Sequence, residues 1–264
     1  MTVAVAELAK EILCTAGPAQ KCAVAAQLPE AAMIADFVDV PDRPARPERP
    51  LLLAPKHMKR RGTRTQGGRV ALLHAVAHIE LNAIDLAADL LARFGSDPRI
   101  ADEARSAFLS DWAKVAAEEA RHFTLLTKRL GELGASYGDL PVHDGLWRAA
   151  LATSDDLLAR LAIVPLVLEA RGLDVTPSMI DSLRDAGDDA SASVLAIILE
   201  EEVGHVAAGW RWFDHLCRRE GHEPGEAFQG LVARFMPGAV RGPFNHGARS
   251  RAGLLRHLYI AASA

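Results

Sequence analysis

Aromatic side chains are scarce in this sequence of 264 residues, at 5%, and runs of β-branched residues are rare. Strands are rich in both kinds of residue, whereas the alanine and leucine that dominate here favour helices. Half of the residues are hydrophobic, which is enough to bury a sizeable core. The composition therefore predicts an all-α protein, with one domain plus additions as the simplest organisation.

Cysteine is also scarce, and Cys14, Cys22 and Cys217 form neither a C-x-x-C pair nor an even disulfide set. We interpret them as reduced thiols in a cytoplasmic protein. No stretch approaches about eighteen uninterrupted apolar residues, so no membrane-spanning helix is expected. Charged residues interrupt the Ala/Val-rich segment 1–32, which argues against a signal peptide.

Charge and motifs exclude further classes of protein. The net charge of -4 gives no overall attraction to nucleic acid or to an anionic membrane. Glycine-rich phosphate-binding motifs and the G-x-S-x-G motif are absent from the sequence. Nucleotide binding and serine hydrolase chemistry are therefore not indicated.

Changes in composition divide the chain into four regions. Residues 1–36 predict an N-terminal helical appendage, with a break at Gly17-Pro18. Residues 37–68 are rich in proline, lysine and arginine and predict an extended strap. We interpret the strap as a solvated connection that wraps the core, with a nucleic-acid-binding arm as the alternative. Residues 69–220 form the predicted bundle, and residues 221–264 form a C-terminal extension.

Four long helical segments are predicted within the bundle, at about 69–95, 100–134, 152–173 and 177–220. Residues 174–177 separate the last two, with Thr176 as N-cap and Pro177 at the first helical position. Four long helices joined mainly by short turns predict a four-helix bundle. In the extension, a Pro/Gly-rich segment at 236–247 precedes a short final helix at about 252–262.

Each of the four segments carries a glutamate on its apolar face, where charged residues are normally absent. The residues three, four and seven positions away are mostly aliphatic or aromatic. A lone buried carboxylate is costly unless it is paired or binds a metal, and the sequence shows no matching set of buried cations. The four residues are Glu80, Glu119, Glu169 and Glu202.

Two histidines complete the pattern. Glu119-Ala-Arg-His122 and Glu202-Val-Gly-His205 both read E-x-x-H, which puts the two side chains one turn apart on one helical face. One such motif arises often by chance, but two of them behind two further glutamates supply the ligands of ferritin-like di-iron and di-manganese proteins. A buried polar network is the alternative. The predicted metal ligands are Glu80, Glu119, His122, Glu169, Glu202 and His205.

Two glutamates complicate this ligand set. Pro165 should kink the third helix four residues before Glu169. Glu201 offers a ligand that competes with Glu202. Glu118, in contrast, shares a helical face with charged residues and is expected to be solvated.

Other titratable residues of the first predicted helix are interpreted as structural. His74 and His78 lie off the line of Glu80 along the helix. Asp85 and Asp89 are four residues apart and are expected to form a solvated ridge. The alternative for Asp85 is to orient a ligand histidine.

Several strings in the chain are distinctive: His-Ile-Glu-Leu-Asn-Ala-Ile-Asp-Leu-Ala at 78–87, the segment 108–122 ending in Glu-Glu-Ala-Arg-His, Glu-Glu-Glu-Val-Gly-His at 200–205, Pro-Asp-Arg-Pro-Ala-Arg-Pro at 41–47 and Gly-Pro-Phe-Asn at 242–245. Together they resemble the bacterial DUF455 family of ferritin-like proteins over residues 37–257. The resemblance implies a ferritin-like bundle with a di-metal site and a distant relation to the tRNA-hydroxylating di-iron monooxygenases. It implies no particular substrate.

We therefore expect a protein with two metal ions, iron first and manganese second, that acts as an O2-dependent oxidase or monooxygenase. Its substrate would be a small molecule, or RNA as the alternative, and a monooxygenase would need an electron donor. No membrane partner is expected, and a dimer is one option for the assembly. The alternative functions are a ferroxidase, a peroxide scavenger, an iron store and a non-enzymatic helical scaffold.

Overall fold

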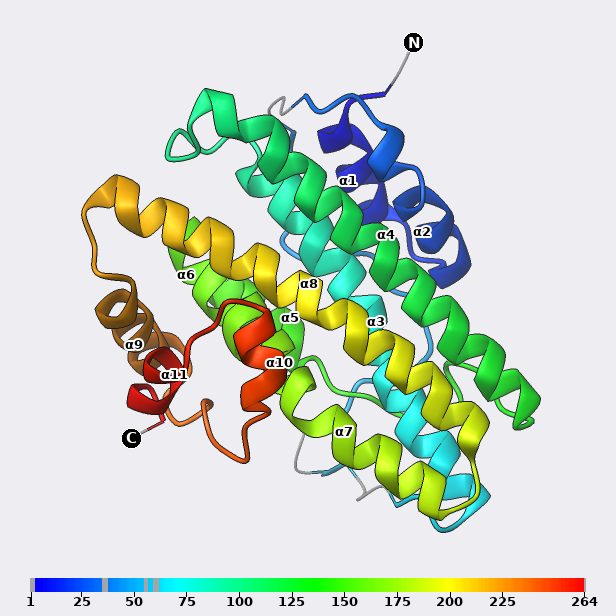
Figure 1. Cartoon of the computed structure of the whole chain (residues 1–264). Coiled ribbons are helices and arrows are strands. Elements are labelled where there is room, and N and C mark those ends of the chain that lie inside the picture. Colours follow the sequence, from blue (N-terminus) through cyan, green and yellow to red (C-terminus); the bar gives the residue numbers. More distant parts are fainter. Residues whose placement is uncertain (1–2, 35–37, 55–56, 59–61, 264) are drawn as a thin grey trace.

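The computed structural model describes residues 3–34, 38–54, 57–58 and 62–263, and the regular elements in these ranges are helices (Figure 1). The expected all-α class is confirmed. Among the described residues, strand-like pairing is limited to two isolated bridges, Ala4 with Ala32 and Leu52 with Val142. The N-terminal helices lie on one flank of the long helices and the C-terminal ones on another.

The N-terminal segment forms two short helices, α1 (Val5–Cys14) and α2 (Pro18–Ala25), followed by the 3-10 turn η1 (Leu28–Glu30). Gly17 precedes α2, and Pro18 takes its first helical position, where a fixed φ and a missing N–H are tolerated. The expected break at Gly17-Pro18 is confirmed. α1 packs mainly on the first long helix and α2 on the second.

The first two long helices, α3 (Gln66–Phe94) and α4 (Asp102–Glu132), pack against each other as a hairpin. Thr65 caps α3 by accepting a hydrogen bond from the backbone N–H of Gly68 at 3.1 Å. Within the described residues, α3 alone is long and apolar enough to cross a membrane, with a mean hydropathy of 1.4. Because 72% of this stretch is buried, α3 resembles the core helix of a soluble protein.

The second half of the core is less regular than the sequence predicts. The helix expected at 152–173 is divided, and the helix expected at 177–220 is interrupted at 186–188. The observed elements are α5 (Gly145–Ala152), α6 (Leu157–Ile163), a π-helical stretch η3 (Val164–Glu169), α7 (Ala170–Asp185) and α8 (Asp189–Glu220). α7 and α8 pack as a second hairpin, and α8 also contacts α4.

Pro165 lies inside the π-helical stretch, so the distortion expected at this proline takes the form of a widened helical turn. Gly209 of α8 faces it at very short range, because a Cβ at Gly209 would lie 2.3 Å from Cβ of Pro165. A glycine is therefore required where α8 crosses the π-helical stretch.

The predicted helix boundary at 174–177 is wrong, because α7 runs through Pro177, and Thr176 is interior rather than an N-cap. A proline inside a helix leaves the carbonyl four residues earlier without its backbone donor, and here that carbonyl belongs to Leu173. Asn245 of the C-terminal extension donates instead, with its Nδ2 3.1 Å from Leu173 O. This contact joins residues 72 positions apart, so local propensity could not predict it.

The C-terminal extension contains more helix than predicted. α9 (Pro224–Phe235) was not expected, while α10 (His246–Arg251) and α11 (Arg256–Ala261) stand near the single short helix that was. Arg249 of α10 is 3% exposed and pairs with Asp174 of α7, with Nη2 2.6 Å from Oδ2. The extension is therefore fixed to the core by buried contacts.

Four basic residues of the predicted strap lie outside the described residues: Lys56, Lys59, Arg60 and Arg61. The described stretch 38–54 contains no α-helix, whereas the last three residues of the predicted strap, 66–68, already belong to α3. Ala45 N donates to Leu13 O at 2.7 Å, and Trp147 Nε1 donates to Asp42 O at 3.0 Å. This part therefore lies against the helices, as a wrapping connection should.

Asp85 and Asp89 on α3 are fully buried, so the expected solvated ridge is wrong. Asp85 pairs with Lys21 of α2 and with Arg46 of the strap, and not with a ligand histidine. Asp89 pairs with two arginines, Arg93 and Arg160. The cations beside Asp85 come from α2 and the strap, and Arg160 beside Asp89 comes from α6, so no local pattern on α3 reveals these three.

Candidate metal centre

Four of the predicted ligands, contributed by three helices, form one compact group. Glu80 comes from α3, Glu119 and His122 from α4, and Glu202 from α8. One potential ligand atom from each residue lies within 4.8 Å of the others. Glu80, Glu119 and His122 are at most 3% exposed. This buried Glu/His group could hold a metal ion.

His122 turns its Nδ1 toward the carboxylates. This atom lies 3.1 Å from Glu80 Oε2, 3.4 Å from Glu119 Oε2 and 4.0 Å from Glu202 Oε1. The opposite ring nitrogen, Nε2, lies 2.7 Å from Glu201 Oε2. The ring therefore presents one nitrogen to the cluster and is held by the other.

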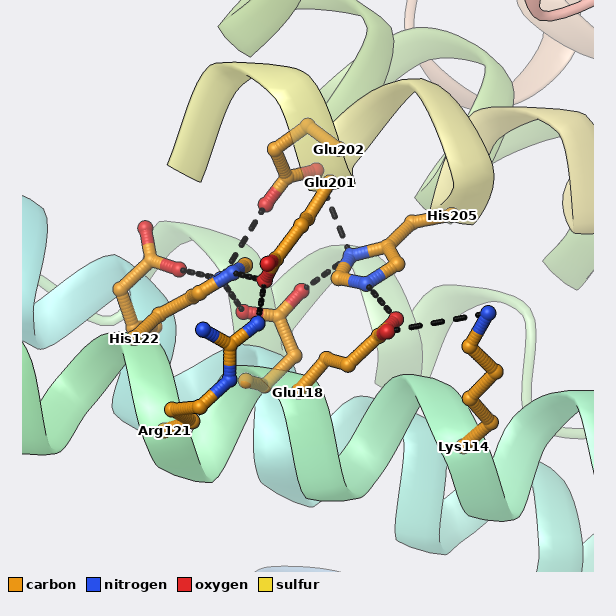
Figure 2. A network of polar contacts seen from close by, with 9 residues as sticks. Lys114, Glu118, Arg121, His122, Glu201, Glu202 and His205 are labelled. Carbon is orange, nitrogen blue, oxygen red and sulfur yellow. Dashed lines mark hydrogen bonds and ion pairs between the residues drawn. The ribbon is translucent and has the colours of Figure 1, made fainter. Parts of the chain in front are cut away.

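His205 has the same arrangement (Figure 2). Its Nδ1 lies 2.9 Å from Glu119 Oε1 and 3.6 Å from Glu202 Oε2, while its Nε2 lies 3.1 Å from Glu118 Oε2. The centroids of the two imidazole rings are 5.7 Å apart. The two oxygens of Glu119 thus face different histidines.

Glu169 is the last residue of η3 and is not one of the four residues in this compact group. Its Oε2 is buried and has no hydrogen-bond partner. Burial, followed by the negative charges of Glu202 and Glu119, raises the pKa of Glu169 well above its ordinary value, while His205 opposes the shift. The charges that act on Glu169 are therefore those of Glu202, Glu119 and His205.

Several cluster atoms are buried without a hydrogen-bond partner, although such atoms are normally satisfied in folded proteins. His205 Nδ1 and Glu119 Oε1 are close to each other but lack hydrogen-bond geometry. These atoms carry lone pairs that suit a cation with oxygen and nitrogen ligands. They are both carboxylate oxygens of Glu119, Oε2 of Glu169, Oε2 of Glu202 and Nδ1 of His205. The donor set therefore fits a metal ion.

Glu118 and Glu201 hold the outer nitrogens of the histidines. The expectation that Glu118 is solvated is wrong, because its side chain is 24% exposed and contacts His205. Glu201 contacts the outer nitrogen of His122 and pairs with Arg121, which places its carboxylate away from the cluster centre. A carboxylate on Nε2 keeps the proton there and leaves Nδ1 as a metal donor.

The helices α4 and α8 present the same E-E-x-x-H string in opposite directions. Glu118 of α4 holds His205 of α8, and Glu201 of α8 holds His122 of α4. Each leading glutamate therefore serves the histidine of the other helix (Figure 2). The repeated E-E in front of each x-x-H is the sequence signal that could have identified these two residues.

Comparison with known proteins places the sequence in a protein family. Residues 14–260 match the family described as "Protein of unknown function (DUF455)". The chain belongs to the DUF455 family. It is 38% identical over 253 residues to an uncharacterized protein of Haemophilus influenzae, covering 92% of this chain and 88% of that protein. No solved structure matches the chain. The expected DUF455 family is confirmed.

Two histidines control the charge of the central carboxylate in this DUF455 chain. Burial alone would raise the pKa of Glu119, but His205 and His122 hold it below its ordinary value. Burial opposes protonation of His122, yet its contacts with Glu119 and Glu80 raise its pKa to about 11. Against burial, Glu202 and Glu119 raise the pKa of His205 as well. Glu119 thus lies between two imidazoles whose pKa values are raised, and its own pKa is lowered.

The pKa values of Glu80 and Glu202 shift in the opposite direction from that of Glu119. Burial, then the charge of Glu119, raises the pKa of Glu80 well above its ordinary value. The same two causes raise the pKa of Glu202. Without a cation, these raised pKa values favour protonation of the two histidines, Glu80 and Glu202, so metal binding is coupled to proton release.

His74 and His78 lie in a separate network. Nδ1 of His78 is 2.8 Å from the hydroxyl of Tyr137, and Nε2 of His74 accepts from Gly138 N at 2.9 Å. Both contacts fix α3 to the segment that follows α4. The structural interpretation of these histidines agrees with these contacts.

Proposed function

We propose that this DUF455 protein is a ferritin-like four-helix bundle that holds two metal ions and uses them for O2-dependent oxidation, as an oxidase or monooxygenase. The ferritin-like arrangement draws one glutamate from each of two helices and E-x-x-H from each of the other two. The proposed ligands are Glu80, Glu119, His122, Glu169, Glu202 and His205.

The observation that carries the proposal is that two carboxylates span both histidines. Glu119 has one oxygen 2.9 Å from His205 Nδ1 and the other 3.4 Å from His122 Nδ1. For Glu202 the corresponding distances are 3.6 and 4.0 Å. A bridging carboxylate binds one metal through each oxygen. Each metal would also take one histidine nitrogen and one further glutamate, Glu80 on one side.

Glu169 supplies the other side of the proposed pair. The charge of His205 opposes the raised pKa of Glu169, whereas Glu80 contacts His122 directly. The two half-sites are then alike: one terminal glutamate, one imidazole and a share of two bridging carboxylates. A single ion would leave one of these halves with buried, unsatisfied oxygens.

The chemistry of the donors indicates the metal. Carboxylate oxygens and imidazole nitrogens without thiolate suit iron or manganese. Zinc sites usually take four ligands or fewer from the protein, whereas six are available here. We favour iron, with manganese as the alternative.

Two bound ferrous ions would supply two electrons to dioxygen, and an electron donor would return them in a monooxygenase cycle. The chain would hold the ions in a buried site and keep water away from them. Glu118 and Glu201 would keep protons on the outer histidine nitrogens, so that both Nδ1 atoms remain ligands. The substrate would be a small molecule, with RNA as the alternative.

The test begins with anaerobic protein and excess ferrous iron, followed by air, desalting and iron counting. We expect about two irons per chain, and oxygen uptake that stops until a reductant is added. Retention of tens of irons would overturn the oxidase proposal in favour of a store. Iron content far below one per chain would overturn the metal site itself.

A matched control comes from the same glutamate triplet on α8. Glu200 is 70% exposed and pairs with Arg251 on the surface. Glu200→Ala should therefore behave as the unmodified protein does, whereas Glu202→Ala should lose iron. Equal losses in the two variants would point to nonspecific binding by surface acids.

A further inference from the structure

Pro177 leaves a gap in the hydrogen bonding of α7, the helix that follows Glu169. Leu173 O would normally accept from the backbone N–H of residue 177, and proline has none. Asn245 fills this gap with its side-chain amide, at 3.1 Å. The orientation of the amide is fixed, because Oδ1 of Asn245 accepts from Ala248 N at 3.1 Å as the N-cap of α10.

Arg249 strengthens the same junction. Its Nε and Nη2 donate to the two carboxylate oxygens of Asp174 at 2.8 and 2.6 Å. Nη2 also reaches Ala170 O at 3.3 Å, and Asn245 N donates to Asp174 Oδ1 at 2.9 Å. Asp174 is buried, so these are contacts in a dry environment. All of the acceptors lie in the first two turns after Glu169.

Glu169 needs such support because it ends a π-helical stretch. Such a stretch is rare and is less favourable than an α-helix of the same length. On one side, Gly209 lets α8 approach Pro165 closely. On the other side, the contacts of Asn245 and Arg249 hold the α-helix that must resume after Glu169.

We propose that residues 245–249 are a positioning element for Glu169, in which Asn245 replaces the backbone hydrogen bond that Pro177 cannot make. The inference rests on the proposed role of Glu169 as a metal ligand. Loss of the Asn245 bond would let the first turns of α7 fray and move the Glu169 carboxylate. One of the two metal positions would then weaken, while the position near Glu80 would persist.

The test is a cycle of variants titrated with Mn(II), in which free Mn(II) is followed by electron paramagnetic resonance. Asn245→Ser keeps a capping hydroxyl for Ala248 but cannot reach Leu173 O. We expect its second Mn(II) to bind about tenfold more weakly, as happens when groups that orient ligands are removed. Pro177→Ala restores the missing backbone N–H, so Asn245→Ser should have little effect in that background.

Hydrogen–deuterium exchange of the metal-free protein gives an independent measurement. Peptides from 164–178 should exchange faster in Asn245→Ser and return to the original rate after Pro177→Ala. Arg251→Ala is the matched control, since Arg251 also lies on α10 but pairs with exposed Glu200. It should change neither exchange nor Mn(II) binding.

The outcomes separate this inference from the metal proposal. If the unmodified protein binds no Mn(II) or Fe(II), the proposed function fails. If it binds two ions and Asn245→Ser binds both with unchanged affinity, the positioning role is overturned. A loss of affinity that Pro177→Ala does not rescue would also overturn it, because the backbone bond would not be the cause.

Discussion

Helix α3 buries three acids in two different kinds of surroundings. Glu80 is 3% exposed, and Asp85 and Asp89 are fully buried. Each aspartate is paired with two cationic side chains. Glu80 instead faces carboxylates, and the nearest cationic group is the imidazole of His122. The three residues therefore share burial but differ in whether the protein supplies the balancing charge.

The difference shows that burial alone does not identify a metal ligand. A buried acid that already has two side-chain cations is structural and has no need of a metal ion. The glutamate cluster has two imidazoles for four carboxylates and several unsatisfied oxygens. The carboxylates around Glu80 lack enough cationic side chains to balance them, whereas Asp85 and Asp89 do not. This difference points to metal ions at Glu80 and not at the two aspartates.

The largest effect on stability should come from replacing Asp89, which is paired with two arginines, by asparagine. Asp89→Asn removes the charge that balances Arg93 and Arg160, and Arg160 is 1% exposed. We expect the free energy of unfolding to fall by about 3–5 kcal/mol, the usual result of breaking a buried pair. Urea denaturation measures it. A loss below about 1 kcal/mol would mean that these arginines do not depend on Asp89.

The free energy of unfolding of the metal-free protein should fall as the pH rises. The pKa of His122 is about 11 in the folded protein, and about 6.5 in an unfolded chain. The unfolded chain therefore releases this proton first, and the free energy of unfolding should fall by about 2 kcal/mol between pH 6 and pH 8 from His122 alone. The raised pKa values of Glu80, Glu169 and Glu202 act in the same direction.

Melting curves of metal-free and metal-loaded protein at both pH values test this. The lowered pKa of Glu119 acts in the opposite direction, but only below about pH 5, near the ordinary range of a carboxyl. Metal-loaded protein should show a much smaller dependence, since ions replace the protons. A metal-free protein whose melting temperature is unchanged from pH 6 to pH 8 would contradict the account of the cluster.

A smaller effect is expected from the glutamates that hold the outer histidine nitrogens. Glu118→Ala and Glu201→Ala should each weaken metal binding by about 10- to 100-fold, because the imidazole loses the partner that fixes its proton and orientation. Glu200→Ala, on the exposed face of α8, is the control. Unchanged metal affinity in both variants would show that Glu118 and Glu201 do not orient the histidines for metal binding.

The smallest effect on stability should come from Glu80→Gln. Glu80→Gln makes the same carboxylate-to-amide change as Asp89→Asn on the same helix. Because burial and the charge of Glu119 raise the pKa of Glu80, the folded protein favours the neutral form of this side chain, which an amide resembles in charge. Its free energy of unfolding near pH 7 should change by less than about 1 kcal/mol. A loss as large as that of Asp89→Asn would erase the distinction between the two surroundings.

The apolar seams of the helices were sufficient to predict where most of the cluster glutamates point. Glu80, Glu119 and Glu202 are surrounded by aliphatic positions at helical spacing, and the structure brings them together with His122. Periodicity works here because one long helix carries each of these residues without interruption. The sequence also predicted a distortion of the helix at Pro165, although not its π-helical form.

Long-range contacts account for what could not be predicted. α7 passes through Pro177 because Asn245 arrives from 72 residues away. Asp85 is buried because Lys21 and Arg46 reach it from other segments. Glu118 is taken for a solvated residue until α8 brings His205 beside it. Helical periodicity describes one helix at a time, whereas each of these outcomes depends on a second segment.

The most direct test of the central claim is the number of metal ions bound by the double variant Glu119→Ala/Glu202→Ala. Both residues span the two histidines, so their removal should leave no pair of sites, while the Glu200→Ala control should retain about two ions per chain, as the unmodified protein does. Metal analysis of the purified proteins gives the count. We expect far less than one ion per chain in the double variant, and full retention of metal would contradict the assignment of this cluster as a two-metal site.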